Sequence, residues 1–341
     1  MIVADFRIKI AFVDFWQGFD YSIMNFYLAL TERYEVEIMS DYRDADYIFF
    51  SCFGDKHWEV PLTKVKIFVT AENICPDFNT CDYAIGFEWM DYGDRYLRLS
   101  NAYSTKYCKE IFELVEHKHE TELINKDNFC GFVVSNAFAA ELRVQLFEKL
   151  SKYKKIDSGG RWMNNIGGPV TNKLEFDRQH KFSICCENSS HSGYTTEKLP
   201  QALAAQLVPI YWGDPDVSKV YNPKAFIDIS NFKSLDEAVQ YIIRVDQDEA
   251  LYNAMIAEPS LLHPNKDRYD VVVEKLKQFM WHIFDQPLQD AYRFNRQVFH
   301  YYYPAKIANY LRRSRVNPIK LVMIDCFAKI ARLRNRFLQK K

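Results

Sequence analysis

The stretch HKFSICCENSSHSGYTTEKLPQALAAQLVPIYWGDPDV, residues 180–217, is the most informative part of the chain. It contains an apolar run that ends near Cys186, a polar loop, a helical segment and a second apolar run at 208–212. A strand, a helix and a strand in this order are typical of a parallel sheet covered by helices. The stretch therefore predicts an α/β fold.

The helix inside this stretch is expected to begin at Thr195 or Thr196, which are natural N-caps, with Glu197 and Lys198 in its first turn. A helix N-terminus attracts phosphate through its free N–H groups and dipole, and an ammonium adds a full charge. A diphosphate is the expected ligand, and a solvated lysine is an equally weighted alternative. The nucleotide-binding patterns G-x-x-x-x-G-K-[ST] and strand-proximal G-x-G-x-x-G are absent from the sequence.

Strand-length apolar runs and amphipathic segments alternate through most of the remaining sequence. The expected strands are 7–13, 36–40, 46–53, 66–70, 82–87, 129–135, 181–186, 208–212 and 225–229. The expected helices are 21–33, 138–152, 195–206, 235–245 and 247–257. A charged stretch at 109–128 breaks the pattern, so we predict an N-terminal domain over 1–125, a C-terminal domain over 126–300 and a tail over 301–341.

Composition limits the classes of partner and the cellular compartment. The 341 residues carry a formal net charge of −1, which disfavours nucleic acid as a partner. The eight cysteines form no C-x-x-C pair, which favours neither a zinc site nor a disulfide framework. Charged residues interrupt the first apolar stretch, so neither a signal peptide nor a spanning helix is predicted there, and we expect a reducing cytoplasm.

The tail is basic and amphipathic. Its apolar side chains fall mostly on one helical face, and lysine and arginine fill the remaining positions, with Asp325 as the single acid after residue 304. Such a helix suits an anionic membrane surface. We expect peripheral association with the inner face of the cytoplasmic membrane, and a solvated terminal helix is the alternative.

Four further positions carry candidate chemistry. Glu72 follows the strand that ends at Thr70, and functional groups gather at such strand ends, where a carboxylate can take a proton from a hydroxyl. Arg143 lies near the start of a helix, where its guanidinium either binds phosphate or pairs with a glutamate on the helix surface. Asp214 and Asp216 form a D-x-D pair that can chelate Mg²⁺, although a turn around the intervening proline is favoured.

The combined motifs resemble those of the α-1,3/4-fucosyltransferases, above all the bacterial members. ENSSHSGYTTEK (187–198) followed by VPIYWGDPDV (208–217) is similar to the donor-binding signature of that family. VTAENICPDFNTCDYAIGF (69–87) and DRYLR (94–98) resemble its N-terminal pattern. The resemblance spans about residues 60–260.

The resemblance implies a GT-B architecture, in which two Rossmann-like domains face each other across a cleft. It also implies inverting transfer of L-fucose from GDP-fucose, with Glu72 as the general base. Lys198 and Arg143 would hold the pyrophosphate, and Glu197 would bind the ribose hydroxyls. Asn188 and Tyr194 would help to bind the nucleotide. No metal ion or other cofactor is required by this scheme, although a divalent cation could stimulate it.

The implied acceptor is the 3-hydroxyl of N-acetylglucosamine in N-acetyllactosamine, which gives a Lewis x type product on lipopolysaccharide. Alternatives remain open: another nucleotide sugar, the 4-hydroxyl, or glucose in place of N-acetylglucosamine. A non-catalytic carbohydrate-binding protein is a further alternative. A glycoside hydrolase would need two opposed carboxylates and would not explain a phosphate-binding helix.

Overall fold

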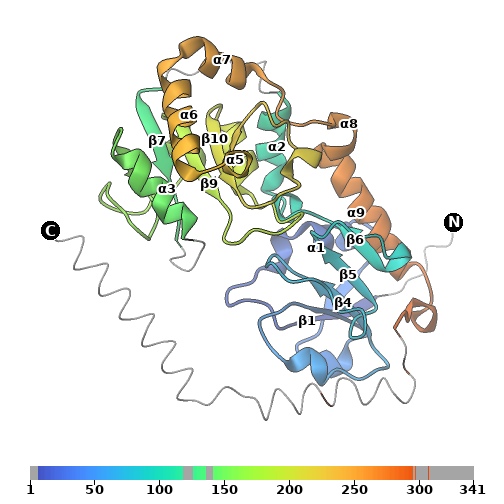
Figure 1. The fold of residues 1–341 in the computed structure, drawn as a ribbon. Helices are drawn as coiled ribbons and strands as arrows, with labels where there is room; N and C mark the ends of the chain where they lie inside the picture. Colours follow the sequence, from blue (N-terminus) through green and yellow to red (C-terminus); the bar gives the residue numbers. More distant parts are fainter. Residues whose placement is uncertain (1–6, 118–125, 136–140, 295, 297–305, 307–341) are drawn as a thin grey trace, which may run out of the picture.

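The computed structural model of the chain describes residues 7–117, 126–135, 141–294, 296 and 306. Within these residues the strands form two sheets, and the strand pairs in both sheets are parallel. Figure 1 shows the sheet of β1–β6 in the lower half of the molecule and the sheet of β7–β11 in the upper half. The predicted α/β class with parallel sheets is confirmed.

The first sheet has the strand order β2-β1-β3-β4-β5-β6. Its central strands are almost continuous apolar runs, and all residues of β3 and β4 are buried, because helices or loops cover both faces. The strands are β1 (Ile8–Val13), β2 (Val36–Ile38), β3 (Tyr47–Phe50), β4 (Val65–Val69), β5 (Tyr83–Gly86) and β6 (Tyr96–Arg98).

The second sheet has the strand order β11-β10-β9-β7-β8. Its strands are β7 (Asn128–Phe132), β8 (Ile156–Ser158), β9 (His180–Cys186), β10 (Val208–Trp212) and β11 (Ile227–Asp228). Strand β9 lies between β7 and β10, so the loop that follows β9 emerges near the middle of the sheet. This central position places the loop 187–197 at the carboxyl edge of the sheet.

The α-helices of the described residues are α1 (Asn25–Thr31), α2 (Cys108–Glu116), α3 (Leu142–Ser151), α4 (Lys173–Arg178), α5 (Lys198–Ala204), α6 (Leu235–Gln247), α7 (Glu249–Ala257), α8 (Pro264–Asp267) and α9 (Tyr269–Phe284). The helix predicted over 21–33 was too long, because a short 3₁₀ turn at Tyr21–Ile23 precedes α1. The charged stretch expected to break the pattern contains α2. Strands β6 and β8 and helices α4, α8 and α9 were not predicted.

Helix α9 packs against elements of the first sheet although it follows the second sheet in the chain (Figure 1). The indole Nε1 of Trp281 donates to the Ala29 carbonyl of α1 over 2.9 Å. The Phe284 ring lies 4.3 Å from the Tyr47 ring, centroid to centroid. The chain therefore crosses from the first half to the second half and back again.

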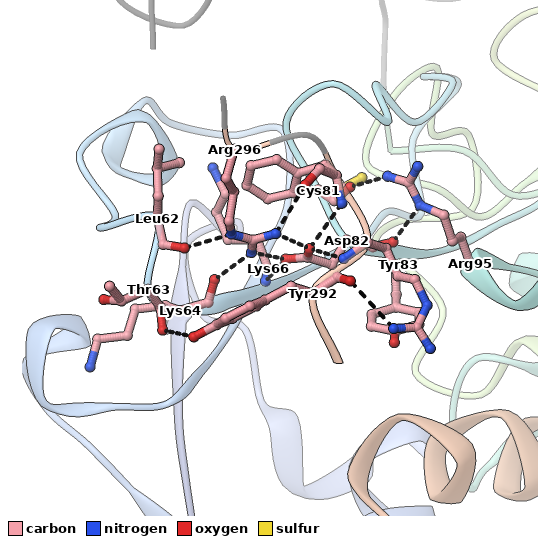
Figure 2. A network of polar contacts seen from close by, with 12 residues as sticks. Leu62, Thr63, Lys64, Lys66, Cys81, Asp82, Tyr83, Arg95, Tyr292 and Arg296 are labelled. Carbon is pink, nitrogen blue, oxygen red and sulfur yellow. Dashed lines mark hydrogen bonds and ion pairs between the residues drawn. The ribbon is translucent and has the colours of Figure 1, made fainter. Parts of the chain in front are cut away.

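The segment after α9 is fixed to the amino edge of the first sheet by the buried carboxylate of Asp82, shown in Figure 2. The Arg296 guanidinium contacts both carboxylate oxygens of Asp82, at 2.9 and 3.0 Å. The backbone N–H groups of Lys66, Arg293 and Phe294 also donate to this carboxylate. This network holds the segment from Arg293 to Arg296 against the first sheet.

The two sheets share one hydrophobic core. The same cluster includes Phe26 and Phe112 beside the first sheet and Leu199 and Leu203 of α5 beside the second. Helix α2 packs on α5 and links the two parts of the cluster. Two smaller clusters fill the opposite faces of the sheets.

The predicted tail at 301–341 lies outside the described residues, apart from Lys306. None of the helices in the described part of the chain is long and apolar enough to span a membrane. The predicted membrane contact of the tail and the predicted domain boundaries stay predictions.

Candidate functional site

The buried carboxylate of Glu187 organises the loop that leaves β9. This residue directly follows the strand and is 0 % exposed. Its two oxygens accept hydrogen bonds from the N–H and the hydroxyl of Thr196, each over 2.7 Å. The ammonium of Lys198 lies 2.8 Å from the same carboxylate. Glu187 therefore fixes the start of α5 and the side chain that was predicted to bind diphosphate.

Lys198 is held as a cation by its neighbours. It is largely buried, and its Nζ also donates to the Thr196 hydroxyl over 3.0 Å. Burial opposes the charge, but the carboxylates of Glu187 and Glu197 outweigh burial and raise the pKa of Lys198 above its ordinary value. The ammonium is therefore charged and fixed in position at neutral pH.

The predicted N-cap of α5 was wrong. The helix begins at Lys198, its N-cap is Glu197, and no side chain among the described residues caps it. The hydroxyl of Thr196 is engaged by Glu187, and the hydroxyl of Thr195 donates to the Asp214 carboxylate over 2.8 Å. Both threonines bind carboxylates distant in sequence, so the cation of Lys198 rather than a capped helix end defines this part of the site.

The carboxylate of Asp214 shapes the other half of the same loop. It accepts from the N–H of Gly193 and the N–H of Asp216, each over 2.8 Å. Gly193 has a φ of +85°, and a Cβ added there would lie 2.4 Å from the Phe87 carbonyl oxygen, so only glycine fits.

The described residues contain no group of three or more histidine, cysteine, aspartate or glutamate side chains placed to hold a metal ion.

The loop after β4 brings Glu72 towards this site. The N–H of Glu72 donates to the Thr70 hydroxyl over 3.0 Å, and the Asn101 amide donates to the Ala71 carbonyl over 2.5 Å. Asn73 donates from its side-chain amide to the Ser189 hydroxyl over 2.8 Å. These bonds hold an exposed Glu72 beside the loop that follows β9.

Electrostatics also relates Glu72 to Tyr194. The tyrosine is buried, and its ring contacts the Phe87 ring edge to face at 5.0 Å. Burial, followed by the carboxylates of Glu72 and Glu187, raises the pKa of Tyr194 to about 12. The predicted base and a predicted nucleotide-binding residue are therefore close enough to interact.

Arg143 lies in the first turn of α3 and is 1 % exposed. Its guanidinium carbon lies 5.4 Å from the centre of the Trp162 ring. Burial lowers the pKa of Arg143, and interaction with Cys186 at the end of β9 opposes that shift. The alternative that Arg143 is a helix-surface residue is wrong.

The remaining predicted residues flank this group. Asn188 is partly buried and directly follows Glu187. Glu197 is exposed and lines a separate cavity of about 190 Å³ together with Asn101 and Tyr107. Sequence reasoning did not select Glu187 as a site residue, although its place at the end of a buried strand was a signal.

Two parallel sheets joined by a shared core, with polar loops at their carboxyl edges, define a GT-B-like fold. A crystal structure of an α1,3-fucosyltransferase has this fold, with a TM-score of 0.74 and 26 % identity over 87 % of this chain and 95 % of that chain. A second structure, of α1,3-fucosyltransferase with GDP-fucose, gives a TM-score of 0.67 and 27 % identity over 86 % of this chain and 92 % of that chain.

Family models match most of the sequence. The α-(1,3)-fucosyltransferase FucT N-terminal domain matches residues 10–105, and the C-terminal part of glycosyltransferase family 10 (fucosyltransferase) matches residues 123–257. The chain belongs to this FucT family of fucosyltransferases, glycosyltransferase family 10.

The chain spans only part of the length of two relatives that it matches. The α-(1,3)-fucosyltransferase FucT of Helicobacter pylori is 31 % identical over 292 residues, which is 74 % of this chain. A putative fucosyltransferase of Acanthamoeba polyphaga mimivirus is 29 % identical over 206 residues, which is 55 % of this chain. The matched regions cover 60 % of the Helicobacter protein and 34 % of the viral protein.

Proposed function

We propose that the chain transfers L-fucose from GDP-fucose to a hydroxyl of a glycan by a single displacement that inverts the anomeric centre. The glycan oxygen bonds to fucose C1 while the bond from C1 to the diphosphate oxygen breaks. Glu72 takes the proton of the attacking hydroxyl, and GDP leaves with the electron pair. Family membership and the likeness to an α1,3-fucosyltransferase with GDP-fucose support this reaction.

The observation that carries the proposal is the Lys198 ammonium, held 2.8 Å from the buried Glu187 carboxylate at the carboxyl edge of the second sheet. A cation fixed before the reaction stabilises the charge that develops on a departing diphosphate, and such a contact supplies roughly a hundredfold or more in rate. In this proposal Arg143 adds a second cation. Glu197 binds the ribose hydroxyls, and Asn188 and Tyr194 bind the nucleotide.

The proposal assigns the acceptor to the N-terminal half, residues 1–125, and GDP-fucose to the C-terminal half, residues 126–300. A hydrogen bond from Asn73 to Ser189 joins the two loops that would carry base and donor. We take the 3-hydroxyl of N-acetylglucosamine in N-acetyllactosamine as the acceptor position, with lipopolysaccharide as its natural carrier. The 4-hydroxyl is the alternative, because nothing in the donor loop selects between them.

The experiment compares wild type, Glu72→Gln and the control Glu110→Gln with GDP-fucose and N-acetyllactosamine, followed by mass and linkage analysis. Glu110 is an exposed carboxylate in the first turn of α2, so its loss should not affect turnover. A fucosylated product from wild type and the control, reduced at least a hundredfold in Glu72→Gln, supports donor, reaction and base. Activity only with other nucleotide sugars would overturn the choice of fucose.

A further inference from the structure

A second cavity, with a volume of about 460 Å³, lies next to the loop 187–197, called here the donor loop. Its lining includes none of the residues assigned to the donor. Its walls come from both halves of the chain: the end of β6, the segment after β10, and helices α8 and α9. Thr195 of the donor loop forms part of the wall. Cavities of this size hold ligands as large as a sugar or a small oligosaccharide.

The lining of this cavity is strongly cationic. Four basic side chains contribute to it: Arg98, Lys219, Lys266 and Lys275. Lys219 also forms an ion pair with Asp216 at 3.1 Å, so part of its charge is already balanced. A site with such a surplus of positive charge is suited to an anion.

Among the described residues, Asp267 is the single acid in this lining. Burial raises the pKa of the Asp267 carboxyl, and interactions with Lys275, His263, Arg98 and Lys266 oppose that shift. These basic side chains therefore all lie near one point of the cavity. Asp214 and Asp216, outside the lining, also interact with Arg98, so the surplus of positive charge rests on Lys266 and Lys275.

The deepest cation is Arg98, the last residue of β6. In the part of the chain that the structure describes, its buried Nε has no hydrogen-bond partner. The buried hydroxyl of Tyr221, a residue 2 % exposed in the same lining, also has none. Buried donors without partners are costly, so Arg98 and Tyr221 keep unsatisfied hydrogen-bonding capacity behind the wall of this cavity.

An aromatic wall stands beside these donors. The Trp89 ring lies 3.5 Å from the Arg98 guanidinium carbon, centroid to carbon, and 5.0 Å from the Lys219 ammonium. Arg98 covers one face of this ring, and Trp89 is 40 % exposed, so the rest of its indole is open to a ligand. An indole face packs on the apolar face of a sugar ring, whereas a bare inorganic ion gains nothing from it.

We infer that this cavity is a binding site for an anionic sugar, with a phosphate or carboxylate bound by Arg98 and the lysines and the ring packed on Trp89. The site is separate from the proposed diphosphate site at Lys198 and Arg143. One part of the inference rests on the proposed function: if the chain transfers fucose, the bound sugar is a charged residue of the acceptor glycan. Binding itself does not depend on turnover.

Calorimetric titration tests this inference with three probes: glucose 6-phosphate, glucuronic acid and glucose. Each is titrated into the full chain with and without saturating GDP, which fills the proposed donor site. The variants are Arg98→Gln and the pair Lys266→Gln with Lys275→Gln, whose exposed side chains can be changed without disturbing the buried wall. Lys224→Gln is the matched control, because this lysine is exposed and lies outside the cavity lining.

We expect at least one charged probe to bind wild type and Lys224→Gln at least tenfold more tightly than glucose, with GDP present. The better of the two charged probes identifies phosphate or carboxylate as the anion. Both sets of cavity variants should lose at least tenfold in affinity for that probe, and the lysine pair tests the site even if Arg98→Gln does not fold.

Three results would overturn the site: equal binding of all three probes, competition of the charged probe with GDP, or affinity unchanged in the lysine pair. A failure of GDP itself to bind would count against the proposed function alone. The titrations without GDP would still test whether the cavity binds the charged probes.

Discussion

The side-chain amide of Asn73 donates to the hydroxyl of Ser189 over 2.8 Å, and each residue directly follows a predicted site residue, Glu72 and Asn188 respectively. This one bond ties the loop of the proposed base to the loop of the proposed donor site. We therefore expect Asn73→Ala to lower kcat by about tenfold, because the base would be less precisely placed. Steady-state kinetics with GDP-fucose and N-acetyllactosamine measures the change.

A positioning role predicts a fall in kcat with little change in the KM for GDP-fucose. Asn79→Ala is the control, since this exposed asparagine donates to Asp77 within its own turn from both its backbone N–H and its side-chain amide. Loss of stability with unchanged turnover per folded molecule would instead assign Asn73 a purely structural role.

Lys198→Ala should lower kcat/KM for GDP-fucose by at least a hundredfold, since a charge-assisted contact to the leaving diphosphate is lost. The substitution also leaves the Glu187 carboxylate buried without its cation, which lowers stability. The double variant Lys198→Ala with Glu187→Gln removes that buried charge. It should regain stability in urea titration and remain inactive, whereas near-normal turnover in either variant would refute the role of Lys198.

The pH dependence of stability should report on Lys66, which lies beside the buried Asp82 carboxylate. Burial lowers the pKa of Lys66 to about 8, although Asp82 opposes the shift. An unfolded lysine titrates near pH ~10.4, so between these values the unfolded chain binds the proton and the folded chain does not. The free energy of unfolding therefore gains about 3 kcal/mol from Lys66 as the pH rises through this window.

Urea titrations at pH 7.5 and pH 10 measure this effect as a difference between variants. Lys66→Met should lose the increment that wild type shows, while Lys9→Met, an exposed lysine of β1, should keep it. An identical pH dependence in wild type and Lys66→Met would show that the lysine is not charged differently in the folded chain.

Deletion of the residues after 305 should leave turnover of soluble acceptors intact and reduce sedimentation with anionic liposomes. The physical reason is that each basic residue near an anionic surface contributes about 1 kcal/mol to binding. Liposomes of neutral lipid are the control for non-specific sedimentation. Equal binding of both forms to anionic liposomes would remove the membrane proposal.

The strands of the two sheets could largely be predicted from the sequence, because a buried parallel strand such as β4 is a continuous apolar run. Strand β6 could not, since its three residues include Arg98 and become a strand only through pairing with β5. Helix α9 was missed although Val272, Leu276, Met280 and Ile283 follow a helical period.

The site was predicted less completely than the fold. Local capping rules favoured Thr195 or Thr196 at the start of α5, but carboxylates from Glu187 and Asp214 bind their hydroxyls. These partners are 9 and 19 residues away in the chain, so no local rule describes them. The same holds for the bond between Asn73 and Ser189, which joins residues 116 positions apart.

Because α9 returns to the first sheet, the N-terminal half of the protein is not one continuous segment of the chain. A fragment that ended with the N-terminal half would expose the surface of α1 that Trp281 covers, and it would leave Asp82 without Arg296. A single protease cut between the sheets would likewise leave two fragments that stay associated through the contacts of α9 and Arg296 with the first sheet. An autonomous N-terminal unit would have to be assembled by splicing α9 and its following segment directly behind α2.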